Sequence, residues 1–422
     1  MFVLPPDFWT HFLENYWDKR PIVIKQPFAS SIGSWDEVLA GLRNAREQFG
    51  SSNPGTQTRL YTEDGFSPDK TELKNYLPNS NDLSVDDYFE RTSQKLGGQR
   101  FAIILNNFQV SSEPLWYRAR AFMAPIIKKY PILSSDAVLF IGNYERTPLG
   151  IHSDELSVFL FVIKGRKKIY LWPEDYFRDQ FDERRDLDFE LLRKDAISLE
   201  GEVGDLLFWP NSYWHVGESV GGSSISLSLG LTPIHPDEDI WADLKGRMDE
   251  IVYKAFDSES AENSTGASNG HEGLTKVLDL AANAMRRARR DPTFGLSLEG
   301  DRLNRVTGGS FKRVPPPLPW KTLSDDDVVE GCSAYPIQWL VDASHQLVCS
   351  ANGHSFTIPA DPRVIRMLKR LNTGEPLLVS DLIKKYVGTS KSNGLEFVAT
   401  PDGIREVLSK LYSLRGISSP RG

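Results

Sequence analysis

The sequence predicts an α+β protein in which a β-sandwich or barrel is flanked by helices. Between about residue 100 and residue 233, short apolar strands alternate with turn residues, which is typical of such β-structures. Apolar side chains recur at helical spacing near the N-terminus and over 274–291. The last hundred residues alternate short strands with helical stretches, so a small α+β module is expected there.

The length of 422 residues suggests two or three domains. We expect a first domain over 1–240, which contains the barrel with N-terminal helices and a strand. A helical region over 241–315 and a small domain over 316–422 should follow. Segment 257–273 has no large apolar side chain, so it is predicted to be a flexible linker.

Local patterns predict the elements ahead of the barrel. Residues 5–18 and 36–50 are expected to form helices, and the stretch RPIVIKQPF between them is expected to form a strand. Residues 51–80 are rich in Gly, Ser, Asn, Pro and Thr, and are therefore predicted to be loop.

The barrel strands are predicted from apolar runs that end in turn residues. A buried strand, FAIILNNFQV, and a helix over 113–129 precede them. The charged stretch 174–197 is expected to be a solvated insertion between strands. The predicted barrel strands are AVLFIGNYE, HSDELSVFLFVIKG, RKKIYLWP, GDLLFWP and SSISLSLGLTP.

A long amphipathic helix, 274–291, opens the C-terminal part. Its four arginines either favour the C-terminal end of the helix or contact RNA or an acidic partner: Arg286, Arg287, Arg289 and Arg290. Its apolar face should consist of Leu274, Val277, Leu278, Ala281, Met285 and Ala288. After a loop at 315–319 we expect strands IQWLVD, HQLVCSANG and SFTIP, and helices near 361–372, 377–387 and 401–413.

Composition narrows the class of protein. The chain is 40% hydrophobic and 25% charged, as in soluble globular proteins, and its net charge of -8 argues against general affinity for nucleic acid or anionic membranes. The two cysteines, Cys332 and Cys349, form no CxxC pattern, so a zinc knuckle or a disulfide framework is not expected. There is no signal-like N-terminus and no run of about 18 apolar residues, so a cytoplasmic protein is expected.

Two histidines and one aspartate form a candidate metal site. In a strand, residues two apart project to the same face, so His152 and Asp154 should present an imidazole and a carboxylate side by side. His215, after the strand GDLLFWP, supplies a third ligand. Such a set leaves coordination positions open, which suits non-haem Fe(II) that binds a co-substrate and dioxygen. The alternative is that His152 is a hydrogen-bonded strand histidine.

Lys167 shares a predicted strand face with Ile169 and Leu171. A lysine on an apolar face is rarely buried without an anion, so it either reaches the rim or pairs with a ligand carboxylate, such as that of 2-oxoglutarate. Four hydroxyl groups nearby either bind the same ligand or are ordinary strand and turn residues: Tyr144, Thr147, Ser226 and Ser228. Three aromatic residues either line a substrate groove or belong to the core: Trp209, Tyr213 and Trp214.

These residues resemble the JmjC-type, Fe(II)- and 2-oxoglutarate-dependent oxygenases, and within them the ribosomal-oxygenase-like branch. The resemblance rests on NYERTPLGIHSDELSVFLFVIKGRKKIYLWPEDYF, GDLLFWPNSYWHVGES and SLSLG, and on FLENYWDKRPIVIKQPF at 12–28. It implies a double-stranded β-helix of the cupin (jelly-roll) type. It also implies a helical dimerisation region at 274–291 and a winged-helix-like module within 320–422.

The resemblance also implies roles for individual residues. His152, Asp154 and His215 would hold Fe(II). Lys167 would bind the distal carboxylate of 2-oxoglutarate, and Ser226 and Ser228 would lie on the strand that faces it. Some relatives carry Thr three residues before the first histidine, where this chain has Leu149; Thr147 lies two residues further back.

The implied reaction is hydroxylation of an amino-acid side chain in a protein or peptide, with dioxygen as co-substrate and succinate and carbon dioxide as co-products. Demethylation, the tailoring of a peptide natural product or free amino acid, and a non-oxidative reaction with another metal are alternatives among enzymes. A non-catalytic cupin-type interaction protein is the alternative from another class. A homodimer is expected, without a membrane or nucleic-acid partner.

Overall fold

A computed structural model of the chain divides into two compact units. Unit 1 comprises Met1–Pro233 and Phe311–Pro316, and unit 2 comprises Ile234–Ser310 and Pro317–Gly422. The domain boundaries predicted at 240 and 315 stay predictions. The residues that the structure describes are 4–5, 7–28, 32–49, 56–65, 68–130, 132–177, 189–233, 270–392 and 395–419. Within these ranges, no helix combines the length and the apolarity that crossing a lipid bilayer requires.

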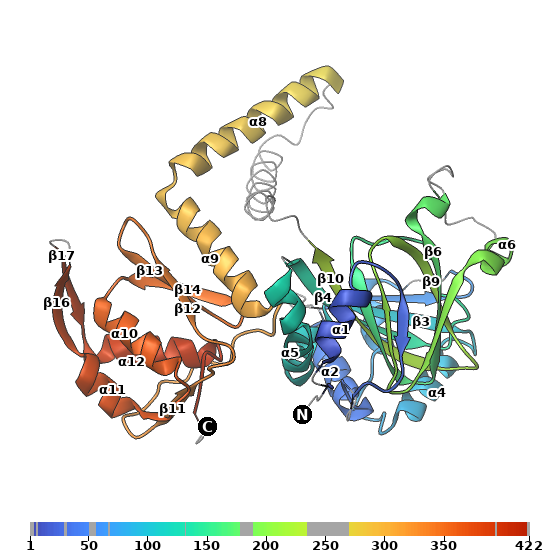
Figure 1. Ribbon diagram of the computed structural model, residues 1–422, viewed down its shortest axis with the longest axis horizontal. Helices are drawn as coiled ribbons and strands as arrows, with labels where there is room; N and C mark the ends of the chain where they lie inside the picture. Colours follow the sequence, from blue (N-terminus) through green and yellow to red (C-terminus); the bar gives the residue numbers. More distant parts are fainter. Residues whose placement is uncertain are drawn as a thin grey trace. The chain divides into compact units, whose positions relative to one another are not determined.

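Two antiparallel sheets form the body of unit 1 (Figure 1). The larger sheet has the strand order β1-β8-β5-β10-β4-β3-β2, and the smaller sheet has the order β7-β6-β9. The larger sheet consists of β1 Ile22–Ile24, β2 Gln57–Thr62, β3 Phe101–Asn106, β4 Ile132–Gly142, β5 Ser157–Lys164, β8 Leu206–Trp209 and β10 Ser224–Pro233. The smaller sheet consists of β6 Arg166–Pro173, β7 Ile197–Glu202 and β9 Tyr213–Ser219.

Strand β5 shows why the central strands lack alternation of polar and apolar residues. Phe159 and Phe161 belong to the core under the helices, whereas Val158, Leu160 and Val162 belong to the core between the two sheets. A strand that is buried on both faces reads as a continuous apolar run. The predicted barrel of antiparallel sheets with flanking helices is therefore confirmed.

Helices cover the outer face of the larger sheet, and α1, α2 and α5 gather on one side of the strands (Figure 1). Helix α2 begins where Ser34 and Glu37 form a capping box, which satisfies two backbone N–H groups at the helix start. The helices of unit 1 are α1 Phe8–Asn15, α2 Trp35–Glu47, α3 Lys70–Leu73, α4 Val85–Lys95, α5 Glu113–Lys129 and α6 Phe189–Leu192. Short 3-10 helices occur at Lys74–Tyr76, Phe108–Ser111, Glu174–Phe177 and Arg193–Asp195.

Two predictions ahead of the barrel were wrong. The loop predicted over 51–80 contains strand β2, because Leu60 is buried and the strand pairs with β3 at the edge of the larger sheet. The strand predicted over FAIILNNFQV ends at Asn106. Asn107 has a left-handed backbone with φ of 57°, which turns the chain into a 3-10 helix.

Strands β7 and β9 of the smaller sheet were not predicted. Strand β7 is only six residues long and begins inside the charged stretch that was predicted to be an insertion, and β9 carries Gly217 in its interior. Both pair with β6, so their strand conformation depends on a partner that is remote in sequence.

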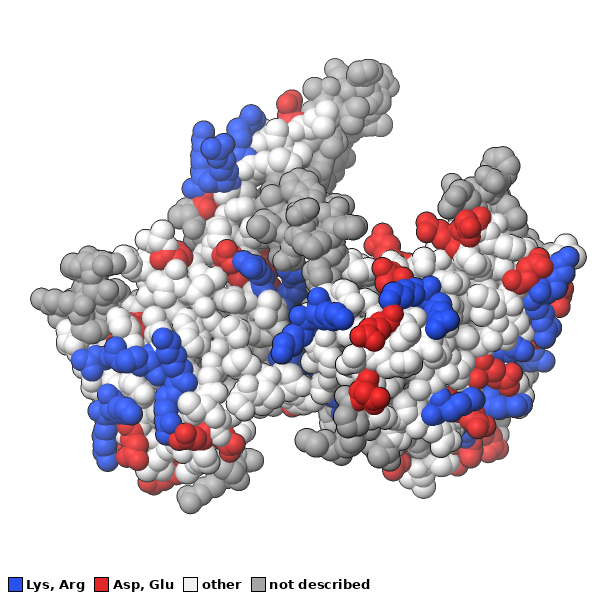
Figure 2. All heavy atoms as spheres, in the orientation of Figure 1, with Lys and Arg blue, Asp and Glu red and all other residues white. Residues whose placement is uncertain are grey.

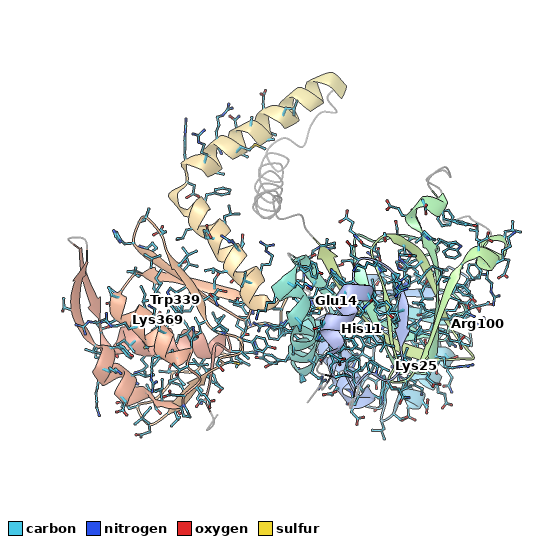
Figure 3. The ribbon with its side chains drawn as sticks, viewed as in Figure 1. His11, Glu14, Lys25, Arg100, Trp339 and Lys369 are labelled. Atoms are coloured by element: carbon cyan, nitrogen blue, oxygen red, sulfur yellow. The ribbon has the colours of Figure 1, made fainter. Side chains whose placement is uncertain are left out.

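Unit 2 has a core of its own, built from α10, α11, α12 and the short strands around them. The three helices predicted over the last hundred residues are confirmed. The helices are α8 Gly270–Arg290, α9 Pro292–Gly308, α10 Pro362–Leu371, α11 Val379–Tyr386 and α12 Pro401–Ser413. The strands are β11 Val328–Gly331, β12 Gln338–Val341, β13 Gln346–Ala351, β14 His354–Pro359, β15 Leu377–Leu378, β16 Gly388–Ser392, β17 Leu395–Ala399 and β18 Ile417–Ser418. Trp339 on β12 and Lys369 on α10 are labelled in Figure 3.

Helix α8 corrects the linker predicted over 257–273, because it already begins at Gly270. Adding a turn to an existing helix costs little, which explains this extension. The rest of the predicted linker lies outside the described residues. The predicted apolar face includes Leu278 and Met285, which are 61% and 48% exposed. Figure 2 shows basic side chains gathered at the end of α8, which carries the exposed Arg286, Arg287, Arg289 and Arg290.

Asp205 joins the end of β1 to the turn between β7 and β8. Its buried carboxylate accepts hydrogen bonds from the Lys25 ammonium at 2.7 Å, the Glu202 N–H at 2.9 Å and the Gln26 N–H at 3.2 Å. Lys25 is labelled in Figure 3. Burial alone would raise the pKa of Asp205, but the donor N–H groups and the ammonium outweigh it and hold that pKa below the ordinary 3.8.

Replacing Asp205 with Asn is expected to lower the free energy of unfolding by about 1–3 kcal/mol at neutral pH, because hydrogen bonds to a buried charge are lost. The folded-state pKa is depressed, so this contribution is present above about pH 4 and disappears as the pH falls through the folded-state value. Urea unfolding at pH 7 and pH 3 measures both effects. Glu202→Gln removes an exposed charge from the same turn and serves as the control; equal losses in the two variants would contradict the assignment.

Candidate metal centre

The two histidines of the candidate site lie opposite each other across an isolated antiparallel β-bridge. The His152 N–H donates to the His215 carbonyl at 3.1 Å, and the His215 N–H donates to the His152 carbonyl at 2.7 Å. Side chains that are directly opposite in such a pair lie on the same face. The two imidazole rings are therefore neighbours, with their centroids 4.3 Å apart.

Asp154 completes the group from a segment without regular structure. The strand predicted over HSDELSVFLFVIKG begins only at Ser157, so the argument that placed His152 and Asp154 on one strand face was wrong. The physical reason is that His152 pairs with β9 of the smaller sheet, whereas β5 belongs to the larger sheet. The chain crosses between the sheets over these residues, and Asp154 lies in the crossing.

The three side chains converge on one point. Asp154 Oδ2 lies 3.7 Å from Nε2 of His152 and 3.7 Å from Nε2 of His215. One donor atom from each residue lies within 4.8 Å of the others. Separations of this size fit three ligands around one ion, because metal–ligand bonds of about 2 Å place neighbouring ligand atoms about 3 Å apart.

Backbone carbonyl groups orient both imidazole rings. The Nδ1 atom of His152 lies 2.9 Å from the Gly150 carbonyl, and Nδ1 of His215 lies 3.4 Å from the Tyr213 carbonyl. A proton on Nδ1 satisfies each carbonyl and leaves Nε2 with a lone pair that points toward Asp154. This is the tautomer that a metal-binding histidine requires.

The electrostatic setting also favours metal binding. Burial, and to a smaller extent the His152 imidazole, lower the pKa of His215 to about 3, so the ring is neutral at physiological pH. The Asp154 side chain is 41% exposed and that of His215 only 10%. The group thus has a buried side formed by protein and an open side. Two nitrogen ligands and one carboxylate in this arrangement suit Fe(II) with free coordination positions.

A cavity of about 620 Å³ opens over the three ligands. Its floor is the inner face of the larger sheet, from Trp209 on β8 to Arg59 on β2, and its other wall includes Lys167 and Ile169 on β6. A volume of this size lies within the usual range for ligand pockets.

Lys167 is buried at one end of this cavity, with only 1% of its surface exposed. Its ammonium lies against the hydroxyl group of Tyr144 and 4.4 Å from the centre of the Tyr144 ring. No carboxylate within ion-pair distance of it occurs among the described residues. Burial therefore lowers the pKa of Lys167 to about 7. A buried cation without a counter-ion, facing a cavity, indicates a site for an anion.

The hydroxyl groups named with Lys167 divide into two kinds. Ser226 is fully buried, lines the cavity and has no hydrogen-bond partner among the residues that the structure describes, whereas Ser228 lines the cavity two residues further along β10. Thr147 also lines the cavity, but its Oγ1 accepts a hydrogen bond from the Gly217 N–H at 3.3 Å. The Thr147 hydroxyl group thus links its loop to β9. The Ser226 hydroxyl group is the one whose hydrogen-bonding capacity a bound ligand would satisfy.

Two of the three aromatic residues line the cavity. Trp209 is 3% exposed and its ring centre lies 5.2 Å from that of His215, so it is both a core residue and part of the cavity wall. Trp214 is partly buried against Phe177, beside the charged insertion. Tyr213 is not among the lining residues.

Polar residues at the far end of the cavity were missed from the sequence. Arg59 on β2 and Asn106 on β3 line it, as does Asp136 on β4. Arg59 was overlooked because 51–80 was taken as loop. The β-branched and aromatic residues of QTRLYT were the available signal for a strand.

The chain resembles known proteins in part of its sequence and in its fold. Residues 109–238 match the JmjC domain family. No curated protein matches the chain. Three solved structures of YcfD, a ribosomal oxygenase from Escherichia coli, are similar. One is 18% identical and covers 99% of both chains with a TM-score of 0.48; one in complex with cobalt and 2-oxoglutarate is 18% identical and covers 100% of both with a TM-score of 0.48. A third is 17% identical, covers 99% of both chains and has a TM-score of 0.50.

The similarity to the third YcfD structure concerns the fold alone, because the sequence identity is only 17%. The family match covers the segment that contains His152, Asp154, Lys167 and His215. The resemblance to JmjC proteins is therefore confirmed for residues 109–238, which match the JmjC domain family.

Proposed function

We propose that the protein is an Fe(II)- and 2-oxoglutarate-dependent oxygenase that hydroxylates an amino-acid side chain of a protein or peptide. The convergence of His152, Asp154 and His215 at the open cavity of a JmjC domain is the observation that carries this proposal. The donor set fits Fe(II), and the buried Lys167 with the unpartnered Ser226 fits an anionic co-substrate.

The chain contributes orientation, charge and exclusion of water. Bound Fe(II) with 2-oxoglutarate supplies the activation of dioxygen, coupled to decarboxylation of the co-substrate to succinate. His152, Asp154 and His215 would hold the iron. The Lys167 ammonium, which contacts the Tyr144 hydroxyl group, would bind the distal carboxylate, and the Ser226 hydroxyl group would donate a hydrogen bond to the same ligand. The apolar cavity wall, which includes Ile169 and Trp209, keeps water away from the metal.

The cavity favours a substrate with a side chain on a longer molecule over a free small molecule. A cavity of about 620 Å³ is larger than a small dicarboxylate needs, and its floor extends across the larger sheet as far as β2. Demethylation and natural-product tailoring would use the same metal ligands as hydroxylation. The three reactions are distinguished by their products. A scaffold without activity would not need a buried, unpaired lysine beside the metal ligands.

Unit 2 supports a second part of the proposal, a homodimer with a winged-helix-like module. Helix α8 exposes Leu278 and Met285 on one face, and exposed apolar faces on a helix are typical of helix–helix association. The helices α10 to α12 with the hairpin β16–β17 have the composition of a small α+β module of this type.

Replacing Asp154 with Ala should remove iron binding and lower succinate formation at least about 100-fold, because the only anionic ligand of the group is lost. The measurements are iron content and the conversion of 2-oxoglutarate to succinate with Fe(II). Glu155→Gln changes the exposed neighbouring carboxylate and should leave both unchanged. If the unaltered protein neither binds iron nor forms succinate, the scaffold alternative is correct.

Replacing Lys167 with Met should raise the Kd for 2-oxoglutarate roughly 30-fold or more, because losing one partner of a buried charge pair costs about 2 kcal/mol or more. Lys168→Met, on the opposite face of β6 near Glu200, is the matched control. Calorimetric titration measures the affinity, and equal weakening by both variants would argue against the role of Lys167.

Lys167 should also make the ligand-free protein more stable as the pH rises. Its folded-state pKa of about 7 lies below its ordinary 10.5, so the unfolded chain binds more protons between these values and the free energy of unfolding increases with pH. Urea unfolding at pH 7 and pH 9 measures this slope. Lys167→Met should flatten the slope, and bound 2-oxoglutarate should do so in the unaltered protein; an unchanged slope in Lys167→Met contradicts the assignment.

Replacing Leu278 with Glu should shift the protein from dimer to monomer, because a charge on the apolar face of α8 would have to be buried. Sedimentation equilibrium measures the mass. Leu83→Glu, at an 81% exposed leucine of unit 1, should leave the dimer intact. A monomeric unaltered protein at micromolar concentration would refute the dimer.

A further inference from the structure

Arg59 lies on the same face of the larger sheet as the co-substrate end of the cavity. The strand register aligns Arg59 with Ile104, Ile104 with Phe140, and Phe140 with Ser226. Residues opposite each other in antiparallel strands share a face, so all four face the cavity, and all four line it. The cavity floor thus runs from a serine near the middle of the sheet to an arginine on its edge strand.

Arg59 and Asn106 offer hydrogen-bond donors that the protein does not use. Asn106 lies two residues after Ile104 on β3, which makes it a diagonal neighbour of Arg59 on the same face. Neither the Arg59 guanidinium nor the Asn106 side-chain amide contacts a hydrogen-bonding or ionic partner in the described ranges. An arginine and an amide side by side form a site for a carboxylate, since the guanidinium binds it with two parallel hydrogen bonds.

The charges of the cavity leave Arg59 without a counter-ion. Of the two cations that line it, Lys167 is matched when 2-oxoglutarate binds, because the iron and Lys167 balance Asp154 and the two carboxylates of the co-substrate. Arg59 then remains as an unmatched positive charge on the substrate side. The cavity should therefore attract a negative group of the substrate.

Asp136, the other carboxylate on this floor, does not neutralise Arg59. Its Oδ1 accepts the Asn107 N–H at 3.0 Å, and no ion pair joins it to Arg59. Burial raises the pKa of Asp136 to about 6, although the Lys312 and Arg313 side chains lower it. This carboxylate is held by the backbone of the turn after β3, and the cations that act on it are Lys312 and Arg313.

We propose that Arg59, assisted by Asn106, is a specificity-determining residue that binds an acidic side chain of the peptide substrate; this inference rests on the function proposed above. Three strand spacings separate β10 from β2, which is roughly 14 Å across the sheet. An extended peptide covers about 3.3 Å per residue. The acidic residue thus lies a few residues along the substrate chain from the side chain that reaches the iron. Ile104, Phe140 and Val138 form an apolar floor for the residues between.

The test is a binding selection that does not depend on turnover. The full-length protein, loaded with Mn(II) and 2-oxoglutarate, is immobilised and offered a random-sequence peptide library of one fixed length. Retained peptides are sequenced by mass spectrometry. Arg59→Gln and Arg59→Glu are the test variants, and Asn106→Asp is a second variant that places a like charge beside the bound carboxylate. Arg100→Gln is the matched control, because Arg100, labelled in Figure 3, pairs with Glu63 and Glu145 and is not among the cavity-lining residues.

The unaltered protein and Arg100→Gln should enrich Asp and Glu at one position roughly tenfold, as expected for a bidentate charged hydrogen bond. Arg59→Gln should lose the enrichment, Asn106→Asp should weaken it, and Arg59→Glu should select Lys and Arg at that position. Retention of the acidic preference by Arg59→Gln, or its absence from the unaltered protein, would overturn the inference. Failure to form succinate in the activity assay would count against the oxygenase proposal alone, because Mn(II) binding and peptide selection are measured without it.

Discussion

The backbone bridge between His152 and His215 is the contact on which the site depends. Two hydrogen bonds hold a residue from the segment before β5 against a residue in the middle of β9, so that both imidazole rings emerge on one side. Without this bridge the His152 segment would not be attached to β9, and neither His152 nor Asp154 would be held beside His215. The bridge costs little, because both residues satisfy backbone groups that a buried chain must satisfy anyway. The candidate metal site thus depends on backbone pairing within the barrel, which is consistent with rigid positioning of its side chains.

The barrel also decides the charge of the cavity. Apolar side chains make up much of the inner faces of the two sheets, so a titratable group that is buried there tends to lose its charge unless a partner stabilises it. Burial keeps His215 neutral. Burial also lowers the pKa of Lys167, whose ammonium contacts the Tyr144 hydroxyl group. A dicarboxylate would stabilise the charged form of Lys167, and a metal ion would bind the neutral form of His215. The cavity is therefore electrostatically incomplete by itself, and a metal ion together with an anionic ligand would complete it.

Much of the fold and of the candidate site was predictable from local sequence patterns. Apolar runs predicted strands β5, β6 and β10, and helical spacing of apolar residues predicted the helices of the last hundred residues. The ligand set was found because His152 begins a predicted strand and has a carboxylate two residues away, and because His215 follows another apolar strand. The argument that His152 and Asp154 share one face of a strand was wrong, because Asp154 lies outside a strand. Sequence spacing identified the candidate ligands, whereas the crossing of the chain from the smaller to the larger sheet brings Asp154 next to the two histidines.

By itself, the sequence determined the composition of the site: two imidazoles, one carboxylate and one lysine on an apolar strand. Residue type and short-range periodicity carry that information, because hydrogen-bonding capacity and strand alternation are local properties. Only the tertiary structure decided that Arg59 belongs to the same cavity. Its face depends on the pairing of β2 with β3, whose aligned residues Arg59 and Ile104 are far apart along the chain, and a shift of one residue would turn the arginine to the other side of the sheet.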